Sequence, residues 1–112
     1  MAERVDRACG QVIGIPSIFP ERVRQAASRL KDFFGDRRFG SIGRDDFRAY
    51  VEKCAEWSPG TDKRPIGNPA EVGRFDIHIL GTIAGFAGEI ALWELIQTWL
   101  EESPVAMAKV LP

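Results

Sequence analysis

Apolar side chains recur every three or four positions between residues 20 and 34, which is the spacing of one face of an α-helix. The residues on this face are Val23, Ala26, Ala27, Leu30, Phe33 and Phe34. Pro20 suits the first turn of a helix, where a missing N–H does no harm, and Gly35 suits the position after the last turn. The pattern therefore predicts a helix over residues 20–34.

The same spacing returns after a glycine-containing loop over residues 35–43. We expect a helix over residues 45–57, with an apolar face made by Phe47, Tyr50, Val51, Cys54 and Trp57. Asp45 and Asp46 favour its first turn, because the N-terminal end of a helix dipole is positive. The polar, Pro- and Gly-containing residues 58–68 are predicted to form a linker.

A further helix start follows this linker. Asn68 can cap a helix, Pro69 suits the first helical position, and Glu71 lies where a capping box has its acid. One uninterrupted helix from this start to Trp99 would be about 45 Å long. It would protrude from a domain of this size, whose radius of gyration should be near 13 Å.

A break in the second half of the chain is therefore expected between Gly81 and Gly88, because glycine in a helix interior costs about 1 kcal/mol relative to alanine. The last helix is predicted over residues 89–102, and residues 103–112 form a tail. At the other end, residues 2–9 predict a short helix ended by Gly10.

The N-terminal residues 11–19 are apolar, and they contain β-branched residues together with Gly14 and Pro16. We interpret them as an extended segment that lies on the core. The chain as a whole is then a single all-α domain of about four main helices, which can be grouped as two helix–loop–helix units over residues 20–57 and 69–102. At 112 residues, such a domain can bury a core without disulfides or metals.

Charge is unevenly distributed along the chain. Residues 1–65 carry 13 Lys and Arg against 10 Asp and Glu, whereas residues 66–112 carry 2 against 6. The basic half could meet an acidic partner, or the two halves could pack on each other. The longest apolar stretch, residues 77–100, contains polar residues and three glycines, which argues against a membrane span and a membrane partner.

The two cysteines, Cys9 and Cys54, form no metal-binding motif. Cys54 lies on a predicted apolar face, so we expect a buried thiol, although a disulfide with Cys9 is possible. The N-terminus has no secretion signal. These features favour a reducing, cytoplasmic location.

A short pattern occurs twice in the chain. Residues 40–47 (GSIGRDDF) and 88–95 (GEIALWEL) share Gly, any residue, Ile, three residues, an acid and an apolar residue. This spacing resembles the paired loops of the EF-hand family, in which a twelve-residue loop has Gly at position 6 and an acid at position 12. The resemblance covers roughly residues 20–102. A plain helical bundle whose turns use Gly and Ile is the alternative.

The ligand positions of both loops depart from the EF-hand pattern. With Gly35 and Ile83 as the first residues, positions 1, 3 and 5 are Gly35, Arg37 and Phe39 in one loop and Ile83, Gly85 and Ala87 in the other. An arginine repels a cation, and the apolar side chains offer no oxygen ligand. We therefore predict no metal and no cofactor. The resemblance further implies that Ile42 and Ile90, at position 8, pair as a short antiparallel bridge, and that the hands serve as a protein-binding scaffold.

The predicted C-terminal helices carry more apolar surface than one face can bury. We select Phe86, Trp93, Ile96 and Trp99 as partner-binding candidates, because aromatic residues are enriched at binding hot spots. Packing in the core is the alternative explanation. A ridge of small residues at Gly81, Ala84, Gly85, Gly88 and Ala91 permits close helix approach, either within the chain or between two copies.

A basic patch is predicted at Arg37, Arg38, Arg44 and Arg48. Arginine forks match phosphate or carboxylate oxygens, so the patch could bind nucleic acid or an acidic partner. Neighbouring aspartates make a self-neutralising surface the simpler interpretation. His78, the single histidine, has no partner at a catalytic spacing, and the chain contains no recognisable catalytic motif.

Two functions follow from the sequence. The first is a non-catalytic protein-interaction or adaptor module, in which an apolar groove on the C-terminal helices holds a partner helix or a second copy. The alternative is a small regulatory protein that binds nucleic acid or an acidic protein through the basic patch. An enzyme subunit that acts only within a complex is a third, weaker option.

Overall fold

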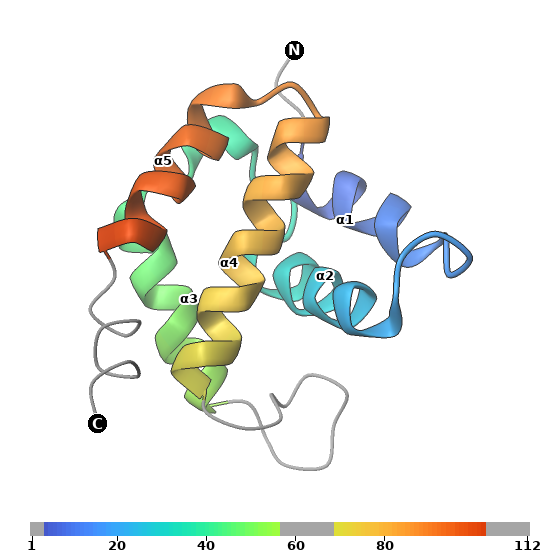
Figure 1. The fold of residues 1–112 in the computed structure, drawn as a ribbon, viewed down its shortest axis with the longest axis horizontal. Helices are drawn as coiled ribbons and strands as arrows, with labels where there is room; N and C mark the ends of the chain where they lie inside the picture. The colour runs from blue at the N-terminus through green and yellow to red at the C-terminus, as the bar shows by residue number, and fades with distance from the viewer. Residues whose placement is uncertain (1–3, 57–68, 103–112) are drawn as a thin grey trace.

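The computed structural model describes residues 4–56 and 69–102. Within them the chain forms α1 (Val5–Ile13), α2 (Glu21–Phe34), the 3₁₀ turn η1 (Phe39–Ser41), α3 (Arg44–Glu56), α4 (Pro69–Phe86) and α5 (Ile90–Glu102). These residues contain no strand, which confirms the all-α prediction (Figure 1). The predicted linker, the tail, Trp57 and the Asn68 cap lie outside the described residues.

The central element is α4, which packs against α2, α3 and α5. In Figure 1, α5 lies on one side of α4, and α1 and α2 lie on the other. The first helix, α1, packs mainly on α2. The radius of gyration is 13.4 Å, which is close to the value expected for a compact chain of this length.

The predicted boundaries of α2 and α3 agree with the structure to within one residue. Pro20 caps α2, and its carbonyl accepts hydrogen bonds from the N–H groups of Val23 and Arg24. Gly35 follows α2 with a positive φ of 58°. At the start of α3, the Asp46 carboxylate accepts a hydrogen bond of 2.8 Å from the Gly43 N–H, so this acid caps the helix.

The prediction for the N-terminus is wrong in one respect. Gly10 does not end the first helix, and residues 11–13 are helical rather than extended, so α1 ends before Gly14. The reason is burial: Val5, Ala8, Cys9 and Val12 form one apolar face at helical spacing and pack into the core. That face outweighs the helix-breaking tendency of Gly10.

The predicted break in the second half of the chain is confirmed. The chain leaves α4 after Phe86 and enters α5 at Ile90. Gly88 has a φ of 82°, a left-handed conformation that favours glycine. The N–H of Glu89 donates to the carbonyl of Ala84, which closes the turn.

Two glycines of α4 bring neighbouring helices into close contact. An added Cβ at Gly81 would lie 3.0 Å from Cγ2 of Ile96 in α5, and one at Gly73 would lie 3.0 Å from the Cα of Val51 in α3. Gly85 similarly faces Trp93. The small residues Gly81 and Gly85 therefore serve packing within the chain, which was one of the two options predicted for the ridge.

Replacing Gly73 with alanine is expected to destabilise the fold. Alanine favours helix formation by about 1 kcal/mol, but overpacking against the Val51 backbone costs about 1–3 kcal/mol, so we expect a net loss near 1 kcal/mol. The matched control is Gly10→Ala, also inside a helix, where an added Cβ meets no atom within 4 Å. This control should gain up to about 1 kcal/mol. Urea unfolding followed by circular dichroism measures both changes, and equal effects of the two substitutions would contradict the packing argument.

Candidate functional site

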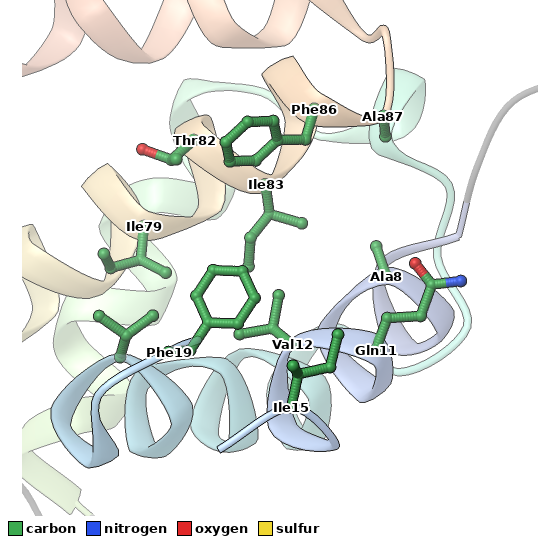
Figure 2. A pocket seen from close by; sticks show the side chains of 11 residues that line it. Ala8, Gln11, Val12, Ile15, Phe19, Ile79, Thr82, Ile83, Phe86 and Ala87 are labelled. Atoms are coloured by element: carbon green, nitrogen blue, oxygen red, sulfur yellow. The ribbon is translucent and has the colours of Figure 1, made fainter. Parts of the chain in front are cut away.

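An apolar groove lies beside the C-terminal half of α4, and α1 and the α1–α2 connection form its other side (Figure 2). Its volume is about 520 Å³. We refer to it as the α1–α4 groove. The residues that line it are Ala8, Gln11, Val12, Ile15, Phe19, Val23, Ile79, Thr82, Ile83, Phe86 and Ala87.

The groove arises because one stripe of α4 is not covered by a second helix. Ile79, Thr82, Ile83 and Phe86 follow the spacing i, i+3, i+4 and i+7, so they share one face of α4. Other faces of this helix pack on α2, α3 and α5, while α1 packs mainly on α2. Figure 2 shows Phe19 and Val12 extending toward Ile83 across the opening.

Large apolar side chains are exposed around this opening. Phe86 is 81% exposed, and Ile15 in the α1–α2 connection is 37% exposed. Ile18, in the same connection, is 68% exposed but does not line the groove. Exposed apolar side chains that surround a concave apolar surface are typical of an interaction site.

Two of the three segments that line the groove carry no charge, and the third, at the start of α2, contributes Val23 between Arg22 and Arg24. Residues 8–20 and 77–88 together make 25 positions without Lys, Arg, Asp or Glu. Since 28% of the chain is charged, about seven charged residues would be expected in a stretch of that length. The lining of the groove is therefore uncharged, while Arg24 lies next to it and donates to the carbonyl of Phe19 at 3.1 Å.

Polar groups are few among the lining residues. Gln11 and Thr82 are the polar side chains among them, and the Thr82 hydroxyl donates to the carbonyl of His78 at 3.3 Å. The lining contains no acid, base or thiol. Within the described residues, no group of three or more His, Cys, Asp or Glu lies close enough to hold a metal ion.

The four predicted partner-binding residues do not form one surface. Phe86 lines the α1–α4 groove, and Trp93, which is 40% exposed, packs at Gly85 on a different side of α4. Ile96 is fully buried, and the Trp99 ring packs on Phe47 with centroids 5.3 Å apart. The placement of Ile96 in a partner surface is therefore wrong.

The cause of this difference is the close packing of α5. Gly81 has no side chain, so Ile96 approaches the α4 backbone and becomes part of the core. The groove consequently lies on α4 and α1 rather than on both C-terminal helices. The sequence-based prediction of an extended segment over residues 11–13 did not indicate that α1 contributes to this site.

The predicted basic patch is partly neutralised by ion pairs. Arg37 pairs with Asp46 at 2.6 Å, and Arg44 pairs with Glu102 at 2.8 Å. Arg38 and Arg48 are exposed. The pairing of two of the four arginines corresponds to the self-neutralising surface described above.

Arg37 occupies a defined position in the loop between α2 and α3. Its guanidinium donates to both carboxylate oxygens of Asp46, at 2.6 and 3.2 Å, and to the backbone carbonyl of Ser41 at 2.7 Å. In the loop register counted from Gly35, Ser41 is position 7 and Asp46 is position 12. An EF-hand presents its calcium ion with a backbone carbonyl at 7 and a carboxylate at 12. Here the arginine cation contacts those two groups.

This ion pair affects the acidity of Asp46. The hydrogen bond from Arg37 lowers the pKa of the Asp46 carboxyl below its ordinary value, and the Gly43 N–H acts in the same direction. The backbone of the same loop also holds α1, since the Val5 N–H donates to the Arg37 carbonyl at 2.9 Å. The loop thus connects α1, α2 and α3.

The second predicted loop has a different form. Residues 83–86 are still part of α4, and α5 begins at Ile90, so only three residues separate the helices. The expected bridge between Ile42 and Ile90 does not form. Ile90 is the first residue of α5, so its backbone is helical rather than extended. Among the described residues, the isolated bridge joins Arg4 and Arg38 instead. Kinship with the EF-hand family stays a prediction.

A buried polar network connects α2, α3 and α4. Arg29 of α2 donates to the two carboxylate oxygens of Asp76 in α4, at 2.7 and 2.8 Å. The hydroxyl of Tyr50 in α3 donates to the same carboxylate at 2.6 Å. Asp76 and Tyr50 are fully buried, so this network serves the structure rather than an exposed site.

Burial determines the acidity of the groups in this region. It raises the pKa of the Asp76 carboxyl, against the opposing hydrogen bonds from Arg29 and Tyr50. It also raises the pKa of Tyr50 well above its ordinary value. Burial raises the pKa of Cys54, and likewise that of Cys9, to about 12. Both cysteines are free and buried, which confirms the expectation for Cys54.

The sequence contained signals for the features that were missed. Asp76 is the only carboxylate between residues 72 and 88, and it shares a helical face with Gly73, Ile77 and Leu80. A single acid on an apolar face predicts a buried partner. The charge-free segments 8–20 and 77–88 are likewise visible in the sequence, but their proximity in space is not.

Comparisons with known proteins do not assign the chain to a family. No protein-family model, curated protein or solved structure matches it. Of the helices that the structure describes, none combines the length and the apolar character that a membrane crossing requires. A functional interpretation therefore depends on the geometry of the site.

Proposed function

We propose that this protein is a non-catalytic interaction module, in which the α1–α4 groove receives an apolar part of a partner protein. The observation that carries this proposal is the exposed ring of Phe86 beside a groove of about 520 Å³ lined almost wholly by apolar side chains. Its volume falls within the range typical of ligand and peptide sites. We further propose a reducing location such as the cytoplasm, since both cysteines are free.

Three features of the site support binding without catalysis. The lining residues include no acid, base or thiol, and their polar groups are limited to one amide and one hydroxyl. Phe86, the most exposed large apolar side chain of the described residues, lines the groove together with the exposed Ile15. The Arg29–Asp76–Tyr50 network is buried beneath packed helices, so a substrate could not reach it.

Site-specific photocrosslinking tests the proposal. Benzoyl-phenylalanine placed at residue 86 should give discrete light-dependent adducts with a partner protein in the cells that produce this chain. The same group at Glu94, an exposed position on α5, serves as the control. Adducts at position 86 that match those at position 94, or no adducts at all, would refute the proposed function.

The alternative function through the basic patch has less support. Arg37 and Arg44 already bind carboxylates of the same chain, so a nucleic acid or acidic partner would have to displace Asp46 and Glu102. Binding of that kind would weaken steeply as salt concentration rises. Binding at the groove, which has no charged lining residue, should not.

A further inference from the structure

We infer that the occupant of the α1–α4 groove is an amphipathic α-helix that lays an uncharged apolar face along about two turns of α4. This inference rests on the proposed function and adds the kind of partner to it. It is carried by two observations, which are the spacing of the α4 side chains in the groove and the absence of charged side chains among the residues that line it.

The spacing of the α4 residues favours a helical partner. The stripe from Ile79 to Phe86 advances seven residues, or about 10 Å along the helix axis. A partner helix covers the same distance with apolar residues at i, i+3 or i+4, and i+7. Side chains on two helices have the same spacing along their axes, so they can interdigitate over the full length of the stripe. The side chains on one face of an extended strand recur every two residues, and their spacing differs from that of the α4 side chains.

The charge pattern defines the face of that helix. None of the residues that line the groove is charged, so a charged side chain that entered it would lose its hydration without meeting an opposite charge in the lining. Complementarity with this surface requires a neutral face on the occupant. Charged residues of the partner helix would then be confined to its solvent side.

The shape of the site favours protruding side chains over a lipid surface. Ile79 and Ile83 are recessed and nearly inaccessible, while Phe86 and Ile15 rise at the rim, so the surface is concave. A flat bilayer would contact the rim and leave the recess empty. The side chains of a helix can fill the recess and cover the Phe86 ring at the same time.

Peptide selection on the purified protein tests this inference. A displayed library of peptides of about 16 residues, long enough for four helical turns, is selected against the full chain. The enriched sequences should share bulky apolar residues at i, i+3 or i+4, and i+7, with no charge on that face. Their affinity should change less than about threefold between low and high salt, because no charge pair is involved.

Two substitutions at exposed apolar residues test the site, and neither removes a side chain from the core. Phe86→Ser should weaken the selected peptides by about tenfold or more, since it removes an aromatic anchor. Ile90→Ser, at an exposed α5 residue that does not line the groove, should leave binding unchanged. Circular dichroism should show increased helix content in the bound peptide.

Several results would overturn the inference. Enriched peptides with apolar residues at i and i+2 would indicate an extended occupant, and displacement of the peptides by neutral phosphatidylcholine vesicles would indicate a lipid. A lack of enrichment over the Phe86→Ser variant would also contradict a helical partner. In each case the photocrosslinking result at position 86 separately decides whether the groove binds a protein.

Discussion

Replacing Asp76 with alanine is expected to lower the free energy of unfolding by about 3–5 kcal/mol, the largest effect of any single substitution considered for this chain. The substitution leaves the Arg29 guanidinium buried without an anionic partner and the Tyr50 hydroxyl without its acceptor. Three donor atoms converge on two oxygens in the native protein, which fits an ionised carboxylate. A domain of this size has a total stability of about 5–15 kcal/mol, so the variant should lose much of it.

Two further variants separate the causes of that loss. Tyr50→Phe removes one hydrogen bond to a charged acceptor and should cost about 1.5–3 kcal/mol. The double variant Arg29→Met/Asp76→Leu removes both charges and should be more stable than Asp76→Ala alone, because no buried charge is left unpaired. Urea unfolding followed by circular dichroism measures all three. If Asp76→Ala stayed within 1 kcal/mol of the native protein, the network would not have the structural role assigned to it.

The free energy of unfolding is expected to fall as pH rises above about 9. Burial raises the pKa of Cys9 and of Cys54 to about 12, from an ordinary thiol value of 9.0. At pH 10 the folded protein therefore keeps both protons, while the unfolded chain releases them, and proton release favours unfolding. Each thiol should then cost about 1–2 kcal/mol relative to pH 7, or about 3 kcal/mol for the two. The raised pKa of Tyr50 acts in the same direction at higher pH.

The Cys9→Ala/Cys54→Ala variant provides the control for this pH dependence. Both side chains are small and lie in the core, so alanine lowers stability at neutral pH but removes the two titrating groups. Its stability should decline less between pH 7 and pH 10 than that of the native chain. Urea titrations at each pH in the presence of a reducing agent measure the two slopes. Parallel slopes would show that other groups cause the alkaline loss.

Helical periodicity was sufficient to place most of the fold. The apolar faces of α2 and α3, the start at Pro69 and the break at Gly88 all depend on local spacing and on the conformational limits of proline and glycine. The error at α1 arose because the local propensity of one glycine was given more weight than burial. A glycine lowers helix propensity by about 1 kcal/mol, and the tertiary burial of Val12 more than offsets this cost.

The candidate site was harder to predict because it depends on which helices pack together. Phe86 was selected from the apolar residues around it in the sequence. The other side of its groove contains Val12, Ile15 and Phe19, and their proximity to Phe86 depends on the packing of α1 on α2. In the same way, nothing local distinguishes the buried Ile96 from the exposed Trp93, since both lie on an apolar helix. Their difference comes from the contact of Ile96 with Gly81 on α4.

The arginine in the α2–α3 loop has a consequence for how this part of the molecule responds to its surroundings. The fraction of loops that bind a dissolved cation depends on the concentration of that cation. The Arg37 guanidinium is part of the same chain, so its presence at the loop does not depend on concentration. The carbonyl of Ser41 and the carboxylate of Asp46 therefore have a positive partner that belongs to the same chain. We expect added divalent cations to leave the arrangement of α2 and α3 unchanged.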